Sequence, residues 1–128
     1  MPAKKVFIIE DDPDSFTSLK KLLLLYSFEV DGVLTVKGDL THQIKTFNPH
    51  IILLDMLMPG IGGLEVCQML NADEQTQNIP ILVVSAVGNP ADIKKAFSLG
   101  VEDYVTKPYD IKVLVEKINK YISYKENL

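Results

Sequence analysis

Three short apolar runs divide the chain and predict the centre of a β-sheet. They span residues 6–9, 51–54 and 81–84, and each is rich in β-branched residues without polar alternation. Strands have this pattern when both of their faces are covered, as in a parallel sheet. Two weaker strands are predicted near residues 29–34, where Asp31-Gly32 interrupts the pattern, and near residues 101–106.

Apolar residues spaced three to four apart predict helices between the strands. A weaker helix over residues 91–99 ends at Gly100, a natural helix stop, and residues 123–128 are expected to fray. The alternation of strand and helix, five times over, predicts a parallel sheet with helices on both faces. The clearest stripes are Phe16, Leu19, Leu23 and Tyr26; Leu40, Ile44 and Phe47; Leu64, Cys67 and Leu70; and Ile111, Leu114, Val115, Ile118 and Ile122.

Composition narrows the classes of function. The chain has 128 residues, which fits one α/β domain over residues 1–128 with a core of about 4–123. A net charge of −4 argues against direct contact with nucleic acid. The single cysteine, Cys67, permits no internal disulfide, and it falls on an apolar stripe typical of core packing. The first apolar run is too short for a signal peptide or membrane span, so we expect a cytoplasmic protein without membrane contact.

Polar residues follow four of the predicted strands at the ends where a parallel sheet binds ligands. Several carboxylates that lie together repel one another unless a cation intervenes, and all-oxygen ligands suit Mg²⁺. A carboxylate can itself attack phosphorus, while a metal, an ammonium and a hydroxyl neutralise the phosphoryl oxygens. The pattern therefore predicts phosphoryl chemistry. In chain order the residues are Glu10, Asp11 and Asp12, then Asp55, then Ser85, then Lys107.

Each of these residues also has a structural interpretation. Asp12 precedes Pro13 and is expected to cap a helix, which leaves Glu10 and Asp11 as the acids of the site. Asp55 alone fits a turn, and Lys107 alone fits a solvated surface charge. The coincidence of such residues at the ends of four strands favours a functional site. His42 and His50 lack partners at metal-ligand spacing.

The ordered set of motifs resembles the receiver domain of two-component response regulators over residues 4–123. That family has a flavodoxin-like, doubly wound sheet of five parallel strands in the order 2-1-3-4-5, with five helices in three layers. The resemblance covers the first strand with its acidic residues, the strand before Asp55 with its loop, and short motifs after it. The matching segments are residues 6–13 and 51–60, Gly63, Ser85-Ala86, residues 100–104, and Lys107-Pro108.

The resemblance implies roles for the site residues. Asp55 would be the phosphoacceptor. Asp11 and Asp55 would bind Mg²⁺ directly, the backbone carbonyl of Leu57 would be a further ligand, and Glu10 would act through a metal-bound water. Lys107 would pair with the phosphoryl group.

The resemblance also implies a switch and partners. Lys107 would precede a cis peptide bond to Pro108. Ser85 would move toward the phosphoryl group and Tyr104 would rotate inward, which would reshape the face of the fourth helix, fifth strand and fifth helix for a downstream protein partner. The donor would be a phosphohistidine on a sensor histidine kinase or histidine phosphotransfer protein, docking near Asp14, Thr17 and Pro108.

The sequence departs from the family pattern at two site residues, and two alternative functions are compatible with the fold. Glu10 stands where aspartate is commoner and Ser85 where threonine is commoner, while Leu57 and Val87 flank the site. A phosphatase of the haloacid-dehalogenase type would carry a second acid where Leu57 stands, so we expect no enzyme acting on a separate substrate. A phosphorylation-independent interaction module on the same fold is the other alternative.

Overall fold

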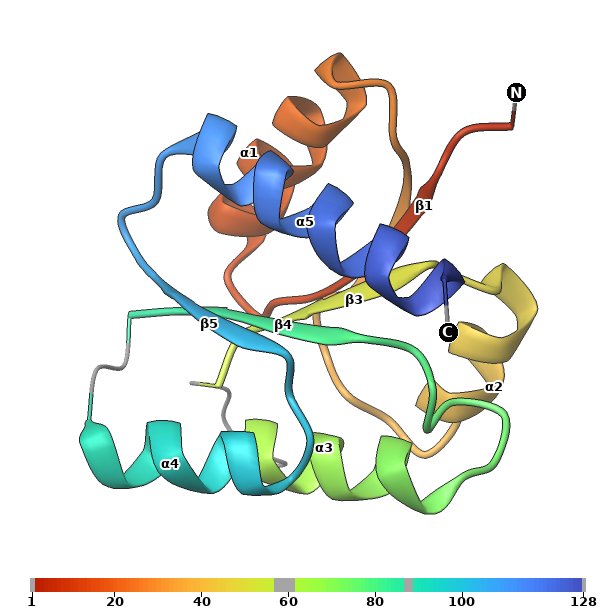
Figure 1. Ribbon diagram of the computed structural model, residues 1–128, viewed down its shortest axis with the longest axis vertical. Helices are drawn as coiled ribbons and strands as arrows, with labels where there is room; N and C mark the ends of the chain where they lie inside the picture. The colour runs from red at the N-terminus through yellow and green to blue at the C-terminus, as the bar shows by residue number, and fades with distance from the viewer. Residues whose placement is uncertain (1, 57–61, 87–88, 128) are drawn as a thin grey trace.

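A five-stranded parallel sheet organises the part of the chain that this computed structural model describes, residues 2–56, 62–86 and 89–127. The strand order is β2-β1-β3-β4-β5, as the resemblance implies (Figure 1). The two outer strands are the two weaker ones in the sequence pattern. The strands are β1 (Lys5–Ile9), β2 (Glu29–Val33), β3 (Ile51–Leu54), β4 (Ile81–Ser85) and β5 (Asp103–Thr106).

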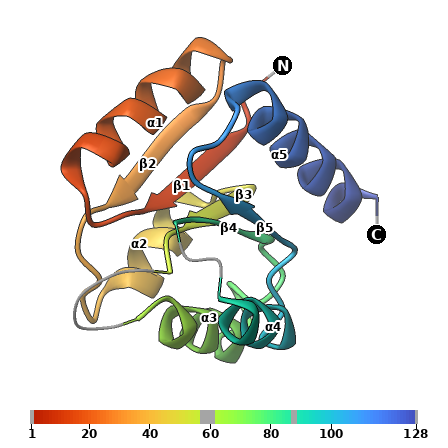
Figure 2. The same cartoon turned by 90° about the vertical axis from the view of Figure 1, so that its left-hand side faces the viewer.

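Helices cover both faces of the sheet and make three layers. Figure 2 shows α1 and α5 on one side and α2, α3 and α4 on the other. The doubly wound fold expected from the resemblance is therefore confirmed, and the predicted apolar stripes lie on the helices, with Tyr26 as the C-cap of α1. The helices are α1 (Pro13–Leu25), α2 (Leu40–Phe47), α3 (Gly63–Ala72), α4 (Pro90–Ser98) and α5 (Ile111–Glu126).

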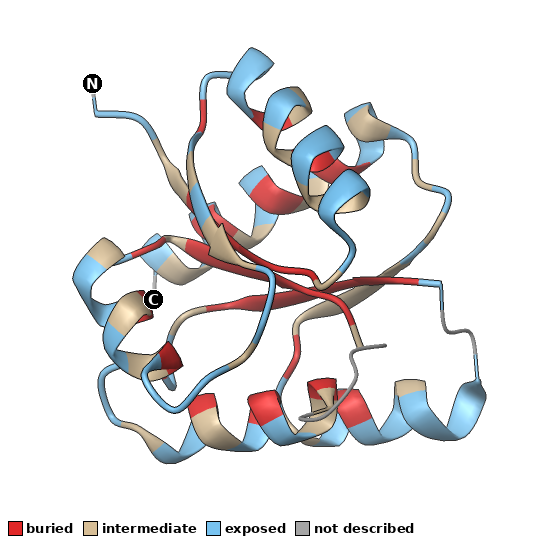
Figure 3. Cartoon of the chain, turned by 180° about the vertical axis from the view of Figure 1, so that it is seen from behind, coloured by how far each residue is buried: buried red, intermediate tan, exposed pale blue. Residues whose placement is uncertain are grey.

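Two separate apolar clusters fill the two sides of the sheet, which explains the unbroken apolar runs. Ile8 and Leu53 belong to the cluster under α1 and α5, whereas Phe7 and Ile52 belong to the cluster under α2, α3 and α4. Successive strand residues point to opposite faces, so a strand covered on both faces needs an apolar residue at every position. β3 and β4 are buried along their whole length, and β1 is buried from Val6 onward (Figure 3).

The expected interruption of β2 at Asp31-Gly32 is wrong, because the strand pairs with β1 through both residues. Gly32 lies opposite Ile8, and a Cβ at this glycine would collide with the carbonyl oxygen of Ile8 and the ring of Phe16. The glycine thus permits a close approach of two strands and of α1 instead of ending a strand. The Asp31 carboxylate accepts a hydrogen bond of 2.8 Å from the Gly32 N–H.

The expected fraying from residue 123 is also wrong, since α5 continues to Glu126. Ile122 is buried, and two ion pairs follow it: Lys125 with Glu102 at 3.1 Å, and Lys4 with Glu126 at 2.8 Å. Such pairs near the surface contribute little individually, so the buried apolar face of α5 is the main reason that the helix continues. None of the helices within the described ranges has the length and apolar character needed to cross a bilayer.

Candidate functional site

The carboxyl ends of four strands bring the predicted polar residues together. Glu10 follows β1, Asp55 follows β3, Ser85 ends β4 and Lys107 follows β5. Backbone hydrogen bonds extend the sheet into the site: the Asp55 N–H donates to the Ile9 carbonyl at 3.0 Å, and the Lys107 N–H donates to the Ser85 carbonyl at 2.9 Å. The side chains are therefore positioned by the sheet itself.

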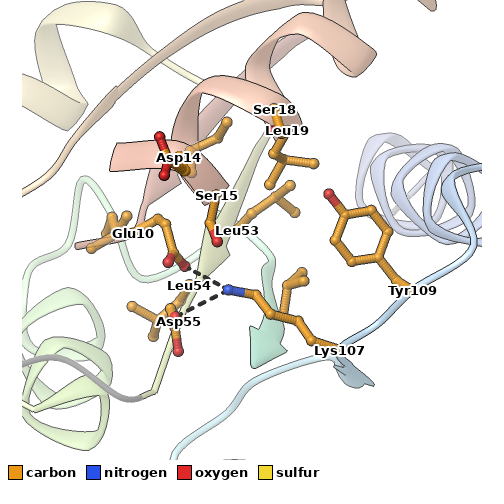
Figure 4. Close-up of a pocket in the computed structure, with 13 residues that line it drawn as sticks. Glu10, Asp14, Ser15, Ser18, Leu19, Leu53, Leu54, Asp55, Lys107 and Tyr109 are labelled. Atoms are coloured by element: carbon orange, nitrogen blue, oxygen red, sulfur yellow. Dashed lines mark hydrogen bonds and ion pairs between the residues drawn. The ribbon is translucent and has the colours of Figure 1, made fainter. Parts of the chain in front are cut away.

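Asp55 lies at the centre of the site and is only 7% exposed. Its Oδ1 accepts a hydrogen bond of 2.9 Å from the Ser85 hydroxyl. Its Oδ2 lies 3.3 Å from the Lys107 ammonium nitrogen, which forms an ion pair with it (Figure 4). A hydroxyl and an ammonium thus flank one buried carboxylate, which is the arrangement expected around a carboxylate that accepts a negatively charged group.

Glu10 shares the same ammonium group. The Lys107 nitrogen donates to Glu10 Oε2 at 3.1 Å. The pKa of Glu10 is raised to about 7, first by burial and then by its hydrogen bond with Asp55, although Lys107 acts in the opposite direction. Burial alone would lower the pKa of Lys107, but the two carboxylates more than compensate and raise it. Because two carboxylates share one ammonium group, the site carries net negative charge when both carboxylates are ionised.

Three carboxylates at this edge of the sheet can hold a metal ion. Glu10, Asp11 and Asp55 each offer an oxygen, and these oxygens lie within 4.8 Å of one another. Carboxylate oxygens are ligands that Mg²⁺ prefers. A bound cation would also reduce the repulsion among these carboxylates. The donor set therefore fits a divalent metal. The predicted fourth ligand, the Leu57 carbonyl, falls outside the described residues, as does Val87.

Ser85 connects Asp55 to Tyr104. Ser85 is completely buried, and Tyr104 is half-buried against the cluster under α2, α3 and α4. Burial raises the pKa of the Tyr104 hydroxyl, and a hydrogen bond with Ser85 acts in the opposite direction. The two residues expected to act as a switch therefore lie next to each other and to the central carboxylate.

Four further features named in the sequence can be placed in the structure: the cap at Asp12, the Lys107–Pro108 peptide bond, Cys67 and His42. Asp12 caps α1, accepting a hydrogen bond of 3.0 Å from the Ser15 N–H, and it is not part of the cluster of Glu10, Asp11 and Asp55 that could hold a metal ion. The peptide bond between Lys107 and Pro108 is cis. Cys67 is buried, and burial raises its pKa to about 11, in keeping with core packing. His42 is exposed on α2.

A cavity that the sequence did not predict adjoins the site. It has a volume of about 250 Å³ and extends from Asp55 and Lys107 into the space between α1 and the residues after β5. Ser18 and Leu19 line it on the α1 side and Tyr109 lines it opposite (Figure 4). Small polar residues at Ser15 and Ser18, three apart on one helix, were a weak signal of this space.

Comparisons with known proteins agree with the geometry. The chain matches the family model of the response regulator receiver domain over residues 6–119. It is 36% identical over 117 residues to the response regulator protein GraR of Staphylococcus epidermidis, and the match covers 89% of this chain and 49% of that protein. The fold is similar to that of a response regulator signal receiver domain from Bermanella marisrubri, with a TM-score of 0.84, 27% identity, and coverage of 94% and 99% of the two chains.

A second relative contains a further region. The chain is 34% identical over 119 residues to the DNA-binding dual master transcriptional regulator RpaA of Synechocystis, and the match covers 89% of this chain and 47% of that protein. The chain thus spans about half the length of these two relatives, and the expectation of no direct contact with nucleic acid stays a prediction. The region matched by the family model, residues 6–119, contains all the site residues described above. This chain therefore belongs to the family of response regulator receiver domains.

Proposed function

We propose that this chain is the phosphoacceptor of a two-component or phosphorelay system. In this proposal Asp55 takes a phosphoryl group from a phosphohistidine on a sensor histidine kinase or a histidine phosphotransfer protein. The observation that carries the proposal is the environment of Asp55, a buried carboxylate with the Ser85 hydroxyl on one oxygen and the Lys107 ammonium on the other. Membership of the receiver family supports the same chemistry.

The reaction is a displacement at phosphorus. An oxygen of ionised Asp55 attacks the phosphorus atom, the phosphorus–nitrogen bond breaks, and its electron pair leaves with the imidazole nitrogen of the donor histidine. The product is an acyl phosphate on Asp55. Lys107, whose raised pKa keeps it protonated, then pairs with one phosphoryl oxygen, and the Ser85 hydroxyl donates to another.

Mg²⁺ is the metal that we propose for this site. Asp11 and Asp55 would hold it directly, the Leu57 carbonyl would be a further ligand, and Glu10 would act through a bound water. When bound, the ion would neutralise charge on the phosphoryl oxygens and reduce the repulsion among the carboxylates. The cluster of three carboxylate oxygens and the raised pKa of Glu10 support this assignment.

The output that we propose is a change of shape and not a reaction on a separate substrate. A phosphoryl group on Asp55 would draw the Ser85 hydroxyl toward it, and Tyr104 would move inward to follow. The face of α4, β5 and α5 would then favour a downstream protein partner, because the modification stabilises one of two conformations. The adjacency of Ser85 and Tyr104 supports this route.

Intact-mass analysis after incubation with acetyl phosphate and Mg²⁺ tests the proposal. We expect one phosphoryl adduct on the wild type, none on Asp55→Asn, and none when the metal is chelated. The absence of an adduct from all samples, with the fold intact by circular dichroism, would instead favour a phosphorylation-independent interaction module. An adduct on Asp55→Asn equal to that on the wild type would reject Asp55 as the acceptor.

A further inference from the structure

The outer edge of β2 is an open edge of the sheet. β2 stands at one end of the strand order and, among the strands that the structure describes, pairs only with β1 (Figure 2). Its Glu29 N–H and Val33 carbonyl form backbone hydrogen bonds of 2.9 and 3.2 Å with the residues that flank β1. Because the backbone groups of a strand alternate between its two sides, those of Asp31 also face β1. The groups that point away from the sheet belong to the residues in between, Val30 and Gly32.

Gly32 leaves this edge bare. A Cβ at this position would collide with the carbonyl oxygen of Ile8, so the close approach of β1 requires glycine. A glycine has no side chain to screen its own N–H and carbonyl groups, both of which face outward here. Unpaired backbone groups on an edge strand are a template for a strand of another molecule. Any protection of this point must therefore come from a neighbouring side chain.

Asp31 supplies that protection. Its Oδ1 accepts a hydrogen bond of 2.8 Å from the Gly32 N–H and so occupies a donor that a second strand would need. The opposite end of the sheet has the same arrangement, because Oδ1 of Asp103 in β5 accepts a hydrogen bond of 2.8 Å from the Tyr104 N–H. The Lys107 N–H is bonded to β4, so the alternation directs the Tyr104 N–H away from β4. Both edge strands therefore carry an aspartate bonded to an outward N–H.

The strand that fits the β2 edge best is β2 of a second copy. In an antiparallel pair centred on Asp31, Val30 of each copy would exchange both of its backbone hydrogen bonds with Gly32 of the other copy. Both outward residues of each strand would then be paired. The same pairing would place the two Asp31 carboxylates directly opposite each other on one face, where like charges destabilise a strand pair. Asp31 thus opposes this pairing through its hydrogen bond and through its charge.

We propose that Asp31 prevents two copies of this chain from joining edge to edge through β2. Without its carboxylate, β2 of each copy would extend the sheet of the other, and the two sheets would become one. The proposal does not depend on phosphorylation, because Asp31 belongs neither to the carboxylate cluster nor to the cavity beside Asp55. A substitution at Asp31 therefore changes association and leaves the phosphoacceptor site in place.

Asp31→Val and Glu29→Val test the proposal as a matched pair. Both residues are exposed on the same face of β2, and each substitution replaces one carboxylate with the same strand-forming residue. Of the two, only Asp31 accepts a hydrogen bond from an outward N–H in the described structure. We expect sedimentation velocity to show Asp31→Val shifting from monomer to dimer at protein concentrations at which the wild type and Glu29→Val stay monomeric. Asp31→Ala, which adds no apolar strand former, should shift in the same direction.

Amide hydrogen exchange at low and high protein concentration locates the contact. In the Asp31→Val dimer, the Val30 and Gly32 N–H groups should gain protection that the same variant lacks as a monomer. Monomeric Asp31→Val and Asp31→Ala, both folded by circular dichroism, would overturn the proposal. A dimer protected elsewhere, or a Glu29→Val dimer as stable as that of Asp31→Val, would overturn it as well. So would a wild type that already pairs through these two N–H groups.

Discussion

The ammonium nitrogen of Lys107 lies 3.1 Å from Oε2 of Glu10 and so joins the residue after β5 to the residue after β1 across the sheet. The same nitrogen lies 3.3 Å from Oδ2 of Asp55. A single cation thus serves two buried carboxylates, and a change to any of these three side chains is expected to alter the protonation of the others.

Replacement of Lys107 should slow phosphorylation without removing the acceptor. Lys107→Ala deletes a donor that points at the oxygens of Asp55, and loss of one such donor typically costs about 10²-fold in rate. The rate of adduct formation from acetyl phosphate, followed by intact mass, measures this effect. Lys112→Ala, at an exposed position on α5, is the matched control and should react at the wild-type rate. A Lys107→Ala rate within about twofold of the wild type would contradict the role of this residue.

Ionisation of Glu10 should lower the free energy of unfolding of the metal-free protein as the pH rises. Its pKa is raised from 4.5 to about 7 in the folded protein, so the folded state binds more protons than the unfolded state between these values. The free energy of unfolding therefore falls as pH increases through this window, and the loss is on the order of 3 kcal/mol. Glu10→Gln mimics the protonated form and should lack this loss.

Urea denaturation in the presence of a chelator, at about pH 4 and about pH 8, measures the contribution of Glu10. At the higher pH, Glu10→Gln should be more stable than the wild type, and at the lower pH the two should be nearly equal. A variant that is less stable than the wild type at the higher pH would show that the charged form of Glu10 stabilises the metal-free site.

His50 should produce the opposite dependence on pH. Its Nδ1 accepts a hydrogen bond of 2.9 Å from the Lys5 N–H at the start of β1. Burial, and next the charge of Lys4, lower its pKa below the ordinary value of 6.5, although Glu126 opposes the shift. The stability contributed by neutral His50 is then complete above about pH 6.5 and is lost as the pH falls below it.

Melting temperatures between about pH 5 and 8 test the contribution of His50. His50→Asn keeps an acceptor but cannot titrate, so this component of the pH dependence should disappear. His42→Asn, at an exposed position on α2, should retain the wild-type profile. Identical profiles for His50→Asn and the wild type would assign the pH dependence to other groups.

Gly63 should tolerate no side chain. A Cβ at this position would lie 2.6 Å from the Met56 sulfur and 2.7 Å from the Met56 Cα, so the residue after Asp55 would have to shift. Gly63→Ala should lower the free energy of unfolding by about 1–3 kcal/mol, which is the usual cost of overpacking. Urea denaturation measures the change. Gly38→Ala is the control, because a Cβ there has no neighbour within 4 Å among the described residues, and it should change the free energy of unfolding by less than about 1 kcal/mol.

The sequence by itself determined the layers of the fold and the membership of the site. Short unbroken apolar runs such as residues 51–54 are typical of strands covered on both faces, and their alternation with helical stripes predicted a parallel sheet between two layers of helices. In such a sheet the strand ends share one edge, and for this reason Glu10, Asp55, Ser85 and Lys107 could be grouped before any contact was known.

Only the tertiary structure decided which of these residues touch and what else surrounds them. The pairing of Lys107 with Glu10 and Asp55 depends on side-chain reach across three strands, which no local pattern encodes. The role of Gly32 was also not readable from the local pattern. It looks like a break in β2, but it lies within the strand, where the absence of a side chain permits the close approach of β1 and α1. A local pattern records burial and polarity along one segment. Distances between segments, and the cavity that α1 leaves beside Tyr109, follow only from how distant segments pack together.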